Sequence, residues 1–257
     1  MQSGICNLNL IPVRKLADHT SEMITQLLFG ETFDILKQEG SWVQVQLHYD
    51  SYIGWIQHRQ YLAFDKSEID SINAKPKVLI SDLLSSVTEK STGNTFALLM
   101  GSTISISSAN QFNFADEIYT FNGHYLEPVP EKETIIKYAE KYLGSPYLWG
   151  GRTHFGIDCS GFTQMVYKLA GYSLPRDASQ QAILGETLSF LAEAESGDLL
   201  FFDNPEGDIV HVGMLYDANK IIHASGNVRI DTIDHQGIYN DELQKYTHQL
   251  RLIKKMV

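Results

Sequence analysis

The chain has 257 residues, which is long enough for two or three domains with a core each. Its hydrophobic content of 43% and charged content of 20% are typical of a folded globular protein. The formal net charge of −11 at pH 7 argues against a nucleic-acid or anionic-membrane partner, because both require concentrated Lys and Arg. It favours a ligand that carries a cationic group.

The chain has two cysteines, Cys6 and Cys159, which are too few for a disulfide framework. Cys6 lies in a strand-like run, where we expect it to pack in a core. No apolar run reaches the roughly 18 residues that a membrane helix needs. The N-terminus lacks the basic and apolar pattern of a secretory signal. We therefore expect a cytoplasmic protein, or a periplasmic or secreted one if a signal was removed.

Residues 1–64 contain short runs in which apolar and polar side chains alternate, with β-branched and aromatic residues throughout. The runs are residues 24–28, 32–36, 42–47 and 52–56. Alternation of this kind predicts short antiparallel strands, and several of them at close spacing predict a small barrel.

A second copy of this pattern is expected in residues 75–127. Residues 27–35 match residues 98–106 at five of nine positions. The polar residues 65–77 are the expected link between the two copies. We therefore predict two small all-β barrels in succession.

From residue 128 the sequence pattern changes. Residues 131–143 have a helical spacing of apolar side chains, with Gly144 as the end signal, and a further helix is expected at about 159–170. Strand-like runs follow at residues 198–202, 211–216 and 220–224. Helices followed by strands predict an α+β domain with an antiparallel sheet over residues 128–257.

Cys159 is a candidate nucleophile at the start of the predicted second helix. Asp158 is its expected N-cap, and the positive end of the helix dipole favours a thiolate in the first turn. The alternative is a small buried core residue, because free cysteine is often buried.

His211 and His223 are the candidate partners of this cysteine. They lie in two runs joined by a short turn, so a hairpin can bring both side chains to one face. A thiolate needs a base, and the base needs a group that holds its tautomer, so His211 is the expected base and His223 its orienting partner. The alternative is a pair of hydrogen-bonded strand histidines without a chemical role. His154 is nearer in sequence, but it lies in a loop that does not fix its direction.

A third interpretation is a zinc site formed by Cys159, His211 and His223 with an open fourth position. Their spacing matches no short ligand motif, and neither CxxC nor HExxH occurs. We therefore expect neither a metal ion nor another cofactor.

Several segments of the C-terminal part, in order and with suitable gaps, carry a family resemblance. They are residues 143–151, 158–162, 174–176, 197–202, 211–214 and 223–226. They resemble the NlpC-type cell-wall cysteine peptidases, whose fold is papain-like, and the two upstream copies resemble bacterial SH3-like domains. By position, the resemblance implies Cys159 as nucleophile, His211 as base and His223 as orienting residue.

The resemblance also implies the reaction. The family cuts peptidoglycan stem peptides, often at the amide between γ-D-glutamate and a diamino acid. The Cys159 thiolate, paired at rest with protonated His211, attacks the γ-carbonyl, and the Cys159 backbone N–H stabilises the oxyanion. Tyr147 and Ser160 are candidate substrate-binding residues; the alternatives are a packed aromatic and a first-turn hydroxyl.

Asp177 departs from the family pattern, which commonly has a small hydroxyl residue there. A carboxylate at the pocket rim suits an ammonium group and resembles the subgroup that prefers stem peptides with a free L-alanine amine. Glu22 and Tyr52 of the first barrel are candidates to reach the same amine; the alternatives are a solvated charge and a barrel aromatic. This implies the release of L-Ala-γ-D-Glu from free fragments during cell-wall recycling. Rival interpretations are an inert wall- or partner-binding module and an acyltransferase or amidase on the same fold.

Overall fold

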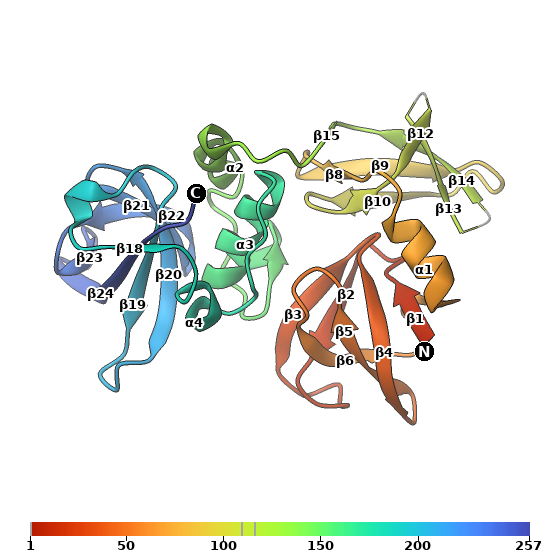
Figure 1. Cartoon of the computed structure of the whole chain (residues 1–257), viewed down its shortest axis with the longest axis horizontal. Coiled ribbons are helices and arrows are strands. Elements are labelled where there is room, and N and C mark those ends of the chain that lie inside the picture. The colour runs from red at the N-terminus through yellow and green to blue at the C-terminus, as the bar shows by residue number, and fades with distance from the viewer. Residues whose placement is uncertain (1, 109, 116) are drawn as a thin grey trace. The chain divides into compact units, whose positions relative to one another are not determined.

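The computed structural model describes residues 2–108, 110–115 and 117–257 (Figure 1). The chain divides into two compact units, Met1–Pro128 and Val129–Val257. The division of the first unit into residues 1–64 and 75–127 stays a prediction. Within the described residues, no helix is both long and apolar enough to cross a membrane.

In residues 2–65, seven strands form one antiparallel sheet in the order β3-β2-β6-β5-β4-β1-β7. The strands are β1 (Gln2–Ile5), β2 (Leu10–Arg14), β3 (Met23–Leu28), β4 (Thr32–Glu39), β5 (Trp42–Leu47), β6 (Ile53–Gln57) and β7 (Leu62–Asp65). Strand β5 shows why the sheet forms: Val43, Val45 and Leu47 all face the core, as the period of a strand requires. The four predicted strands are confirmed as β3 to β6.

The expected polar link between the two copies contains a helix, α1 (Lys66–Asn73). Asp65 and Glu68 form a capping box at its start, and Ile69 is fully buried. The sequence analysis did not predict this helix. The D-x-x-E spacing is the signature that identifies this helix start.

Apart from positions 109 and 116, residues 78–126 form a five-stranded and a three-stranded antiparallel sheet. The strands are β8 (Val78–Ile80), β9 (Leu84–Glu89), β10 (Thr95–Leu99), β11 (Thr103–Ile104), β12 (Ile106–Ser108), β13 (Gln111–Phe114), β14 (Glu117–Asn122) and β15 (Tyr125–Leu126). Their shared core includes Phe29, which comes from the turn between β3 and β4.

The sequence repeat corresponds to a repeated turn. Gly30 and Gly101 both have positive φ, at 79° and 84°. Each turn is closed by the same backbone bond, from Glu31 to Leu28 and from Ser102 to Leu99, both 3.0 Å long. The repeat is therefore structural at this turn, and a second barrel of the same family stays a prediction.

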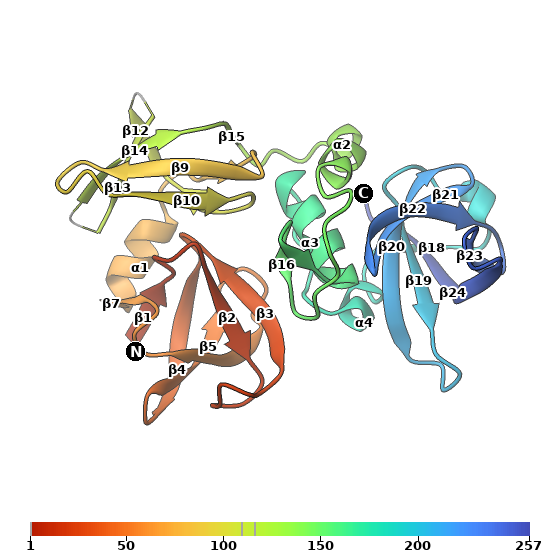
Figure 2. The same cartoon turned by 180° about the vertical axis from the view of Figure 1, so that it is seen from behind.

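The second unit, residues 129–257, is described throughout and is α+β, as predicted (Figures 1 and 2). Its helices are η1 (Lys132–Thr134), α2 (Ile135–Glu140), α3 (Cys159–Leu169), α4 (Ala178–Gln181) and η2 (Leu191–Glu193). The predicted first helix is shorter than expected, because a 3₁₀ turn precedes α2 and turns follow it up to Gly144.

The strands of this unit form a hairpin and a larger sheet. They are β16 (Arg152–Thr153), β17 (Gly156–Ile157), β18 (Glu186–Leu188), β19 (Leu199–Asp203), β20 (Ile209–Asp217), β21 (Lys220–Ser225), β22 (Asn227–Ile233), β23 (Gly237–Asn240) and β24 (Lys245–Lys255). The order is β18-β24-β19-β20-β21-β22-β23, and β23 also pairs with β24. This last pairing closes six strands into a barrel, with β18 added outside it.

Alternating residues of the central strands face the two sides of this barrel wall. One set packs together as an apolar cluster: Leu200, Phe202, Leu215, Ile221, Ile233 and Ile238. The alternate set includes Val212, Met214 and Ile222, which are fully buried, and α3 packs against β20 and β21. Both faces of β20 are therefore covered, and this explains its nearly continuous apolar sequence.

Candidate active site

Cys159 is the first residue of α3, as predicted. The Asp158 side chain caps the helix by accepting from the Gly161 N–H at 2.7 Å. Its other oxygen accepts from the Gly150 N–H at 2.8 Å. Asp158 therefore fixes both the helix start and the glycine-rich loop before it.

Asp158 is also paired with a buried arginine. Arg176 Nη2 and Nη1 donate to its two oxygens at 2.6 and 3.0 Å. Arg176 Nη1 also donates to the Ser160 hydroxyl at 2.9 Å. Ser160 is buried, so its hydroxyl belongs to this network. The two-pronged Arg–carboxylate geometry holds the start of α3 in place.

The predicted hairpin brings His211 and His223 together. His223 pairs with Gly213, so His211, two residues earlier on β20, has its side chain on the same face. The two rings meet through His211 Nε2 and His223 Nδ1, 2.9 Å apart. Gly213 leaves room for this, because a Cβ there would lie 2.8 Å from the His223 Cβ.

A carboxylate continues the chain of hydrogen bonds. His223 Nε2 lies 3.0 Å from Asp231 Oδ2, and Arg229 Nη2 donates to Asp231 Oδ1 at 2.9 Å. His248 of β24 stacks on the His211 ring with centroids 4.2 Å apart. These side chains share the barrel face that carries the apolar cluster, where they form a polar layer next to it.

Burial dominates the electrostatics of the pair. It raises the pKa of Cys159 to about 12, helped by the Asp158 carboxylate and opposed by the Val212 and Ser160 amides and by Arg176. Burial also lowers the pKa of His211 well below its ordinary value, and His223 and His248 add to this. Both shifts favour the neutral thiol and the neutral imidazole over the expected resting ion pair, because burial disfavours the charged forms.

Cys159 lies against the strand that carries His211. The backbone amide of Val212, the next residue after His211, interacts with its sulfur. Within the described residues, no hydrogen bond joins the Cys159 thiol to His211. In many enzymes the nucleophile and its base form their hydrogen bond only when substrate binds. Among the residues that the structure describes, the backbone N–H of Cys159 has no hydrogen-bond acceptor, because the Asp158 side chain accepts from the Gly161 N–H instead.

Tyr147 lies beside the cysteine in the loop that precedes it. Its N–H donates to the Gly226 carbonyl at 2.9 Å, which attaches this loop to the barrel. Burial raises the pKa of its phenol, and the charges of Cys159 and Asp158 raise it further. The hydroxyl therefore keeps its proton at physiological pH and can donate a hydrogen bond, and its role in binding substrate stays a prediction.

The remaining predicted substrate residues lie on helix and strand ends. Asp177 is the N-cap of α4 and shares a capping box with Gln180. Glu22 precedes β3 and pairs with Lys15 at 3.1 Å. Tyr52 is half-buried just before β6. Glu22 and Tyr52 belong to the first unit, and a shared site with Cys159 stays a prediction.

The zinc interpretation does not fit the hydrogen bonds. His211 and His223 direct ring nitrogens at each other, and His223 directs its second nitrogen at Asp231. Across the described ranges, no group of three His, Cys, Asp or Glu side chains is arranged to hold a metal ion. His154 lies against Phe155 in the hairpin loop between β16 and β17, with ring centroids 3.9 Å apart and the ring planes tilted by 40°.

Sequence reasoning missed Asp231, Arg229 and His248. Asp231 is eight residues beyond His223, and only the register of β21 and β22, with His223 opposite Arg229, brings it near. Gly226, with positive φ in the turn between these strands, is the signal that predicts such a register. His248 had no local signal, because its strand joins the barrel from the end of the chain.

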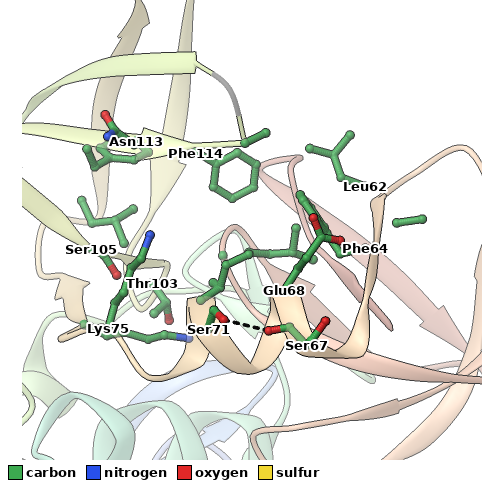
Figure 3. Close-up of a pocket in the computed structure, with 18 residues that line it drawn as sticks. Leu62, Phe64, Ser67, Glu68, Ser71, Lys75, Thr103, Ser105, Asn113 and Phe114 are labelled. Atoms are coloured by element: carbon green, nitrogen blue, oxygen red, sulfur yellow. Dashed lines mark hydrogen bonds between the residues drawn. The ribbon is translucent and has the colours of Figure 1, made fainter. Parts of the chain in front are cut away.

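A cavity of about 620 Å³ lies in the first unit, and its lining includes no cysteine or histidine (Figure 3). Helix α1 forms one wall with Glu68 and Ser71, and Phe64 and Phe114 come from the β-strand regions before and after this helix. Lys75 lies at the end near Thr103 and Ser105. The lining therefore offers no Cys–His pair of the kind that a cysteine peptidase uses.

The comparisons with known proteins agree with a peptidase site of this kind. Residues 144–251 match the NlpC/P60 family, and residues 13–60 match the bacterial dipeptidyl-peptidase Sh3 domain. A gamma-D-glutamyl-L-lysine dipeptidyl-peptidase of Bacillus subtilis (strain 168) is 32% identical over 240 residues, which cover 85% of this chain and 78% of that protein. One of the same name from Bacillus cereus is 29% identical over 230 residues, covering 80% and 68%.

A solved NlpC/P60 family protein from Bacillus cereus ATCC 10987 superposes with a TM-score of 0.85 at 18% identity, covering 98% of this chain and 99% of that one. That likeness shows a shared fold. The fold and the sequence relatives define a cysteine peptidase with an N-terminal SH3-like domain. The chain belongs to the NlpC/P60 family, and it is a hydrolase of that family.

Proposed function

We propose that this chain is a cysteine endopeptidase that hydrolyses the γ-D-glutamyl–diamino acid amide of peptidoglycan stem peptides. Cys159 is the nucleophile, His211 the base and His223 its orienting partner. The observation that carries the proposal is the 2.9 Å contact between the two histidines on the strands that α3 and Cys159 pack against. The names of the two Bacillus relatives, which specify γ-D-glutamyl-L-lysine, support lysine as the diamino acid.

The reaction begins with a neutral pair. As the sulfur attacks the γ-carbonyl carbon of D-glutamate, the thiol proton passes to His211, and the imidazolium then donates it to the departing amine. Breakage of the C–N bond leaves a thioester on Cys159. His211 next takes one proton from water, whose oxygen attacks the thioester carbon and displaces the thiolate. The imidazolium returns that proton to the sulfur, and the released acid loses the other proton of the water to solvent as it becomes the carboxylate.

The start of α3 supplies the oxyanion site in this proposal. The unused Cys159 N–H points from a helix N-terminus, where partial positive charge stabilises the developing oxyanion. Tyr147 donates its phenolic proton near the same carbonyl. The Ser160 hydroxyl already accepts a hydrogen bond from Arg176, so we expect it to contribute little to binding of the substrate main chain.

We propose that the carboxylate of Asp177 selects stem peptides with a free L-alanine amine. Asp177 lies at the start of α4, and Glu22 and Tyr52 of the SH3-like domain are the further candidates that the family resemblance implies. A carboxylate desolvated by substrate but left without its ammonium partner costs several kcal/mol, roughly, so blocked or chain-embedded stems are rejected.

This selectivity gives the enzyme a place in the cell. It would release L-Ala-γ-D-Glu from free fragments in the cytoplasm, as part of cell-wall recycling. We further propose that residues 75–127 are a second bacterial SH3-like domain; the repeated turn at Gly30 and Gly101 supports this.

Product analysis by mass spectrometry tests the function. Wild type and Cys159→Ala receive L-Ala-γ-D-Glu-L-Lys, the same peptide with meso-diaminopimelate, and N-acetylated versions of both. Cys6→Ala is the matched control, because Cys6 is the other buried cysteine. We expect release of L-Ala-γ-D-Glu from free peptides by wild type and Cys6→Ala, and none by Cys159→Ala.

The other outcomes separate the parts of the proposal. Equal cleavage of free and acetylated peptides would keep the peptidase and remove the selection for the amine. Transfer of the acyl group to an added amine in preference to water would favour an acyltransferase. No turnover of any peptide by folded wild type would favour an inert binding module.

A further inference from the structure

We propose that Asp231 is a positioning residue that fixes the tautomers of both histidines and leaves His211 Nδ1 free to accept the Cys159 proton. This inference rests on the proposed function, because it gives His211 the role of base. It also extends the site by a fourth member, since the sequence reasoning and the family resemblance stop at His223.

The positions of the protons follow from what each atom can donate or accept. Burial alone raises the pKa of Asp231, but hydrogen bonds from His223 and Arg229 outweigh it, so the net pKa is lowered and the group is a carboxylate. A carboxylate only accepts hydrogen bonds. At 3.0 Å from Asp231 Oδ2, His223 Nε2 must therefore carry a proton.

The tautomer of His223 then determines the tautomer of His211 through the hydrogen bond between the two rings. In neutral His223 with a proton on Nε2, Nδ1 holds a lone pair and can only accept. Its partner at 2.9 Å, His211 Nε2, must therefore donate. Neutral His211 with a proton on Nε2 has its lone pair on Nδ1, and this is the only nitrogen left to receive a proton from the thiol.

The competing state is one in which His223 carries both protons. Its Nδ1–H would then donate to His211 Nε2, and the proton of His211 would move to Nδ1, where it prevents proton transfer from Cys159. Arg229 acts against that state. It occupies Asp231 Oδ1 at 2.9 Å and so shares the negative charge that would otherwise stabilise an imidazolium at His223.

Other ionisable groups also face the pair. His248 of β24 stacks on His211 and lies edge-on to His223, with centroids 4.2 and 5.8 Å away. Burial and the nearby His223, opposed by the Asp231 carboxylate, lower the pKa of His248 to about 4, so it adds no charge at neutral pH. Glu242 reaches Arg229 Nη1 at 3.4 Å from the exposed side. Asp158 and Arg176 act on Cys159 from the other side of the site.

The decisive variant is Asp231→Asn, which keeps the shape of the side chain but can present an N–H to His223. That donor favours a proton on Nδ1 instead of Nε2 in both His223 and His211. We expect kcat to fall by about 100- to 10,000-fold, as for the corresponding Asp→Asn change in a serine-protease triad, with little change in KM. The rate should recover as pH rises, where hydroxide replaces the lost base.

Asp203→Asn is the matched control. Asp203 lies on neighbouring β19 and pairs with Arg251 at 3.4 Å, outside the histidine chain. It should keep wild-type kcat and the wild-type pH profile. Asp231→Glu retains the carboxylate and should restore most of the lost rate and the profile.

Alkylation of Cys159 by iodoacetamide at pH 7, followed by mass spectrometry, is a readout that needs no substrate. Slower alkylation in Asp231→Asn, with Asp203→Asn at the wild-type rate, supports the role even if no stem peptide is cleaved. The inference is wrong if wild type cleaves peptide and Asp231→Asn keeps the wild-type pH profile with a loss of less than about threefold in kcat. A loss that small lies within the range expected for surface variants. Loss that follows the unfolded fraction in thermal melts would also overturn it.

Discussion

Two buried aspartates belong to the candidate site, and their partners give them different tasks. Asp158 binds a guanidinium and two backbone N–H groups, which can only donate hydrogen bonds. Asp231 binds Arg229 and His223, and the imidazole of His223 can carry its proton on either ring nitrogen. The same side chain therefore serves as a fixed structural anchor at one position and as a control on proton location at the other.

The largest difference is expected in stability. Asp158→Asn leaves the Arg176 guanidinium buried without its counter-charge, and we expect a loss of about 3–5 kcal/mol in the free energy of unfolding. Urea denaturation of the whole chain measures it. Asp231→Asn is the matched control and should lose much less, because Arg229 is partly exposed and keeps Glu242. Equal losses would show that the two carboxylates do not differ in this way.

The space at Gly213 gives the second test. An added Cβ would lie 2.7 Å from Ile221 Cδ1 and 2.8 Å from His223 Cβ. Gly213→Ala should destabilise by about 1–3 kcal/mol and lower kcat by roughly tenfold or more, because His223 is pushed from His211. Adding Ile221→Val removes Cδ1 and should recover stability, but not kcat. Recovery of both would mean that the position of His223 is not important.

A third test uses the pH dependence of kcat/KM. His211 must be neutral to receive the thiol proton, and its pKa lies well below the ordinary 6.5. The acid limb of the profile should therefore lie below pH 6.5, with kcat/KM falling about tenfold per pH unit beneath it. Arg229→Ala should move that limb upward, because a less neutralised Asp231 favours imidazolium at His223. A wild-type limb above pH 7 would contradict this arrangement.

The smallest expected effect is on stability in acid. The pKa of Asp231 is lower in the folded chain than its ordinary value, so its contribution is present above the unfolded pKa of about 4. It is lost as pH falls through the folded pKa. The difference in unfolding free energy between wild type and Asp231→Asn, about 1 kcal/mol at pH 7, should vanish between pH 4 and the onset of acid unfolding. A constant difference would exclude a lowered pKa.

Much of the fold could be predicted because its strands and α3 carry strong local patterns. Alternation identified β3 to β6, and the Asp158 cap with the apolar spacing behind it identified α3. The closure of the barrel was not predictable, since the pairing of β23 with β24 depends on contacts far from any local signal. The helix α1 was missed because its polar composition resembled a linker, although its capping box was present.

The candidate site divides in the same way. Cys159, His211 and His223 were predicted by motifs and by one short hairpin. The expected ion pair does not agree with the directions of the pKa shifts of Cys159 and His211, because burial, which favours their neutral forms, is a tertiary property. Asp231 required the register of a second hairpin, and its chemistry required the distance to His223. Local sequence therefore predicts the reacting groups, whereas their protonation states depend on packing.

The most direct measurement is NMR of the histidine side chains in protein labelled with ¹⁵N-histidine. Spectra of the His211→Gln and His223→Gln variants assign the signals of the two rings. The account predicts, at neutral pH, a protonated Nε2 and an unprotonated Nδ1 on both His211 and His223. In Asp231→Asn the pattern should reverse on both rings. A protonated Nδ1 on His211 in the wild-type enzyme would contradict the account, because no nitrogen would remain to accept the proton of Cys159.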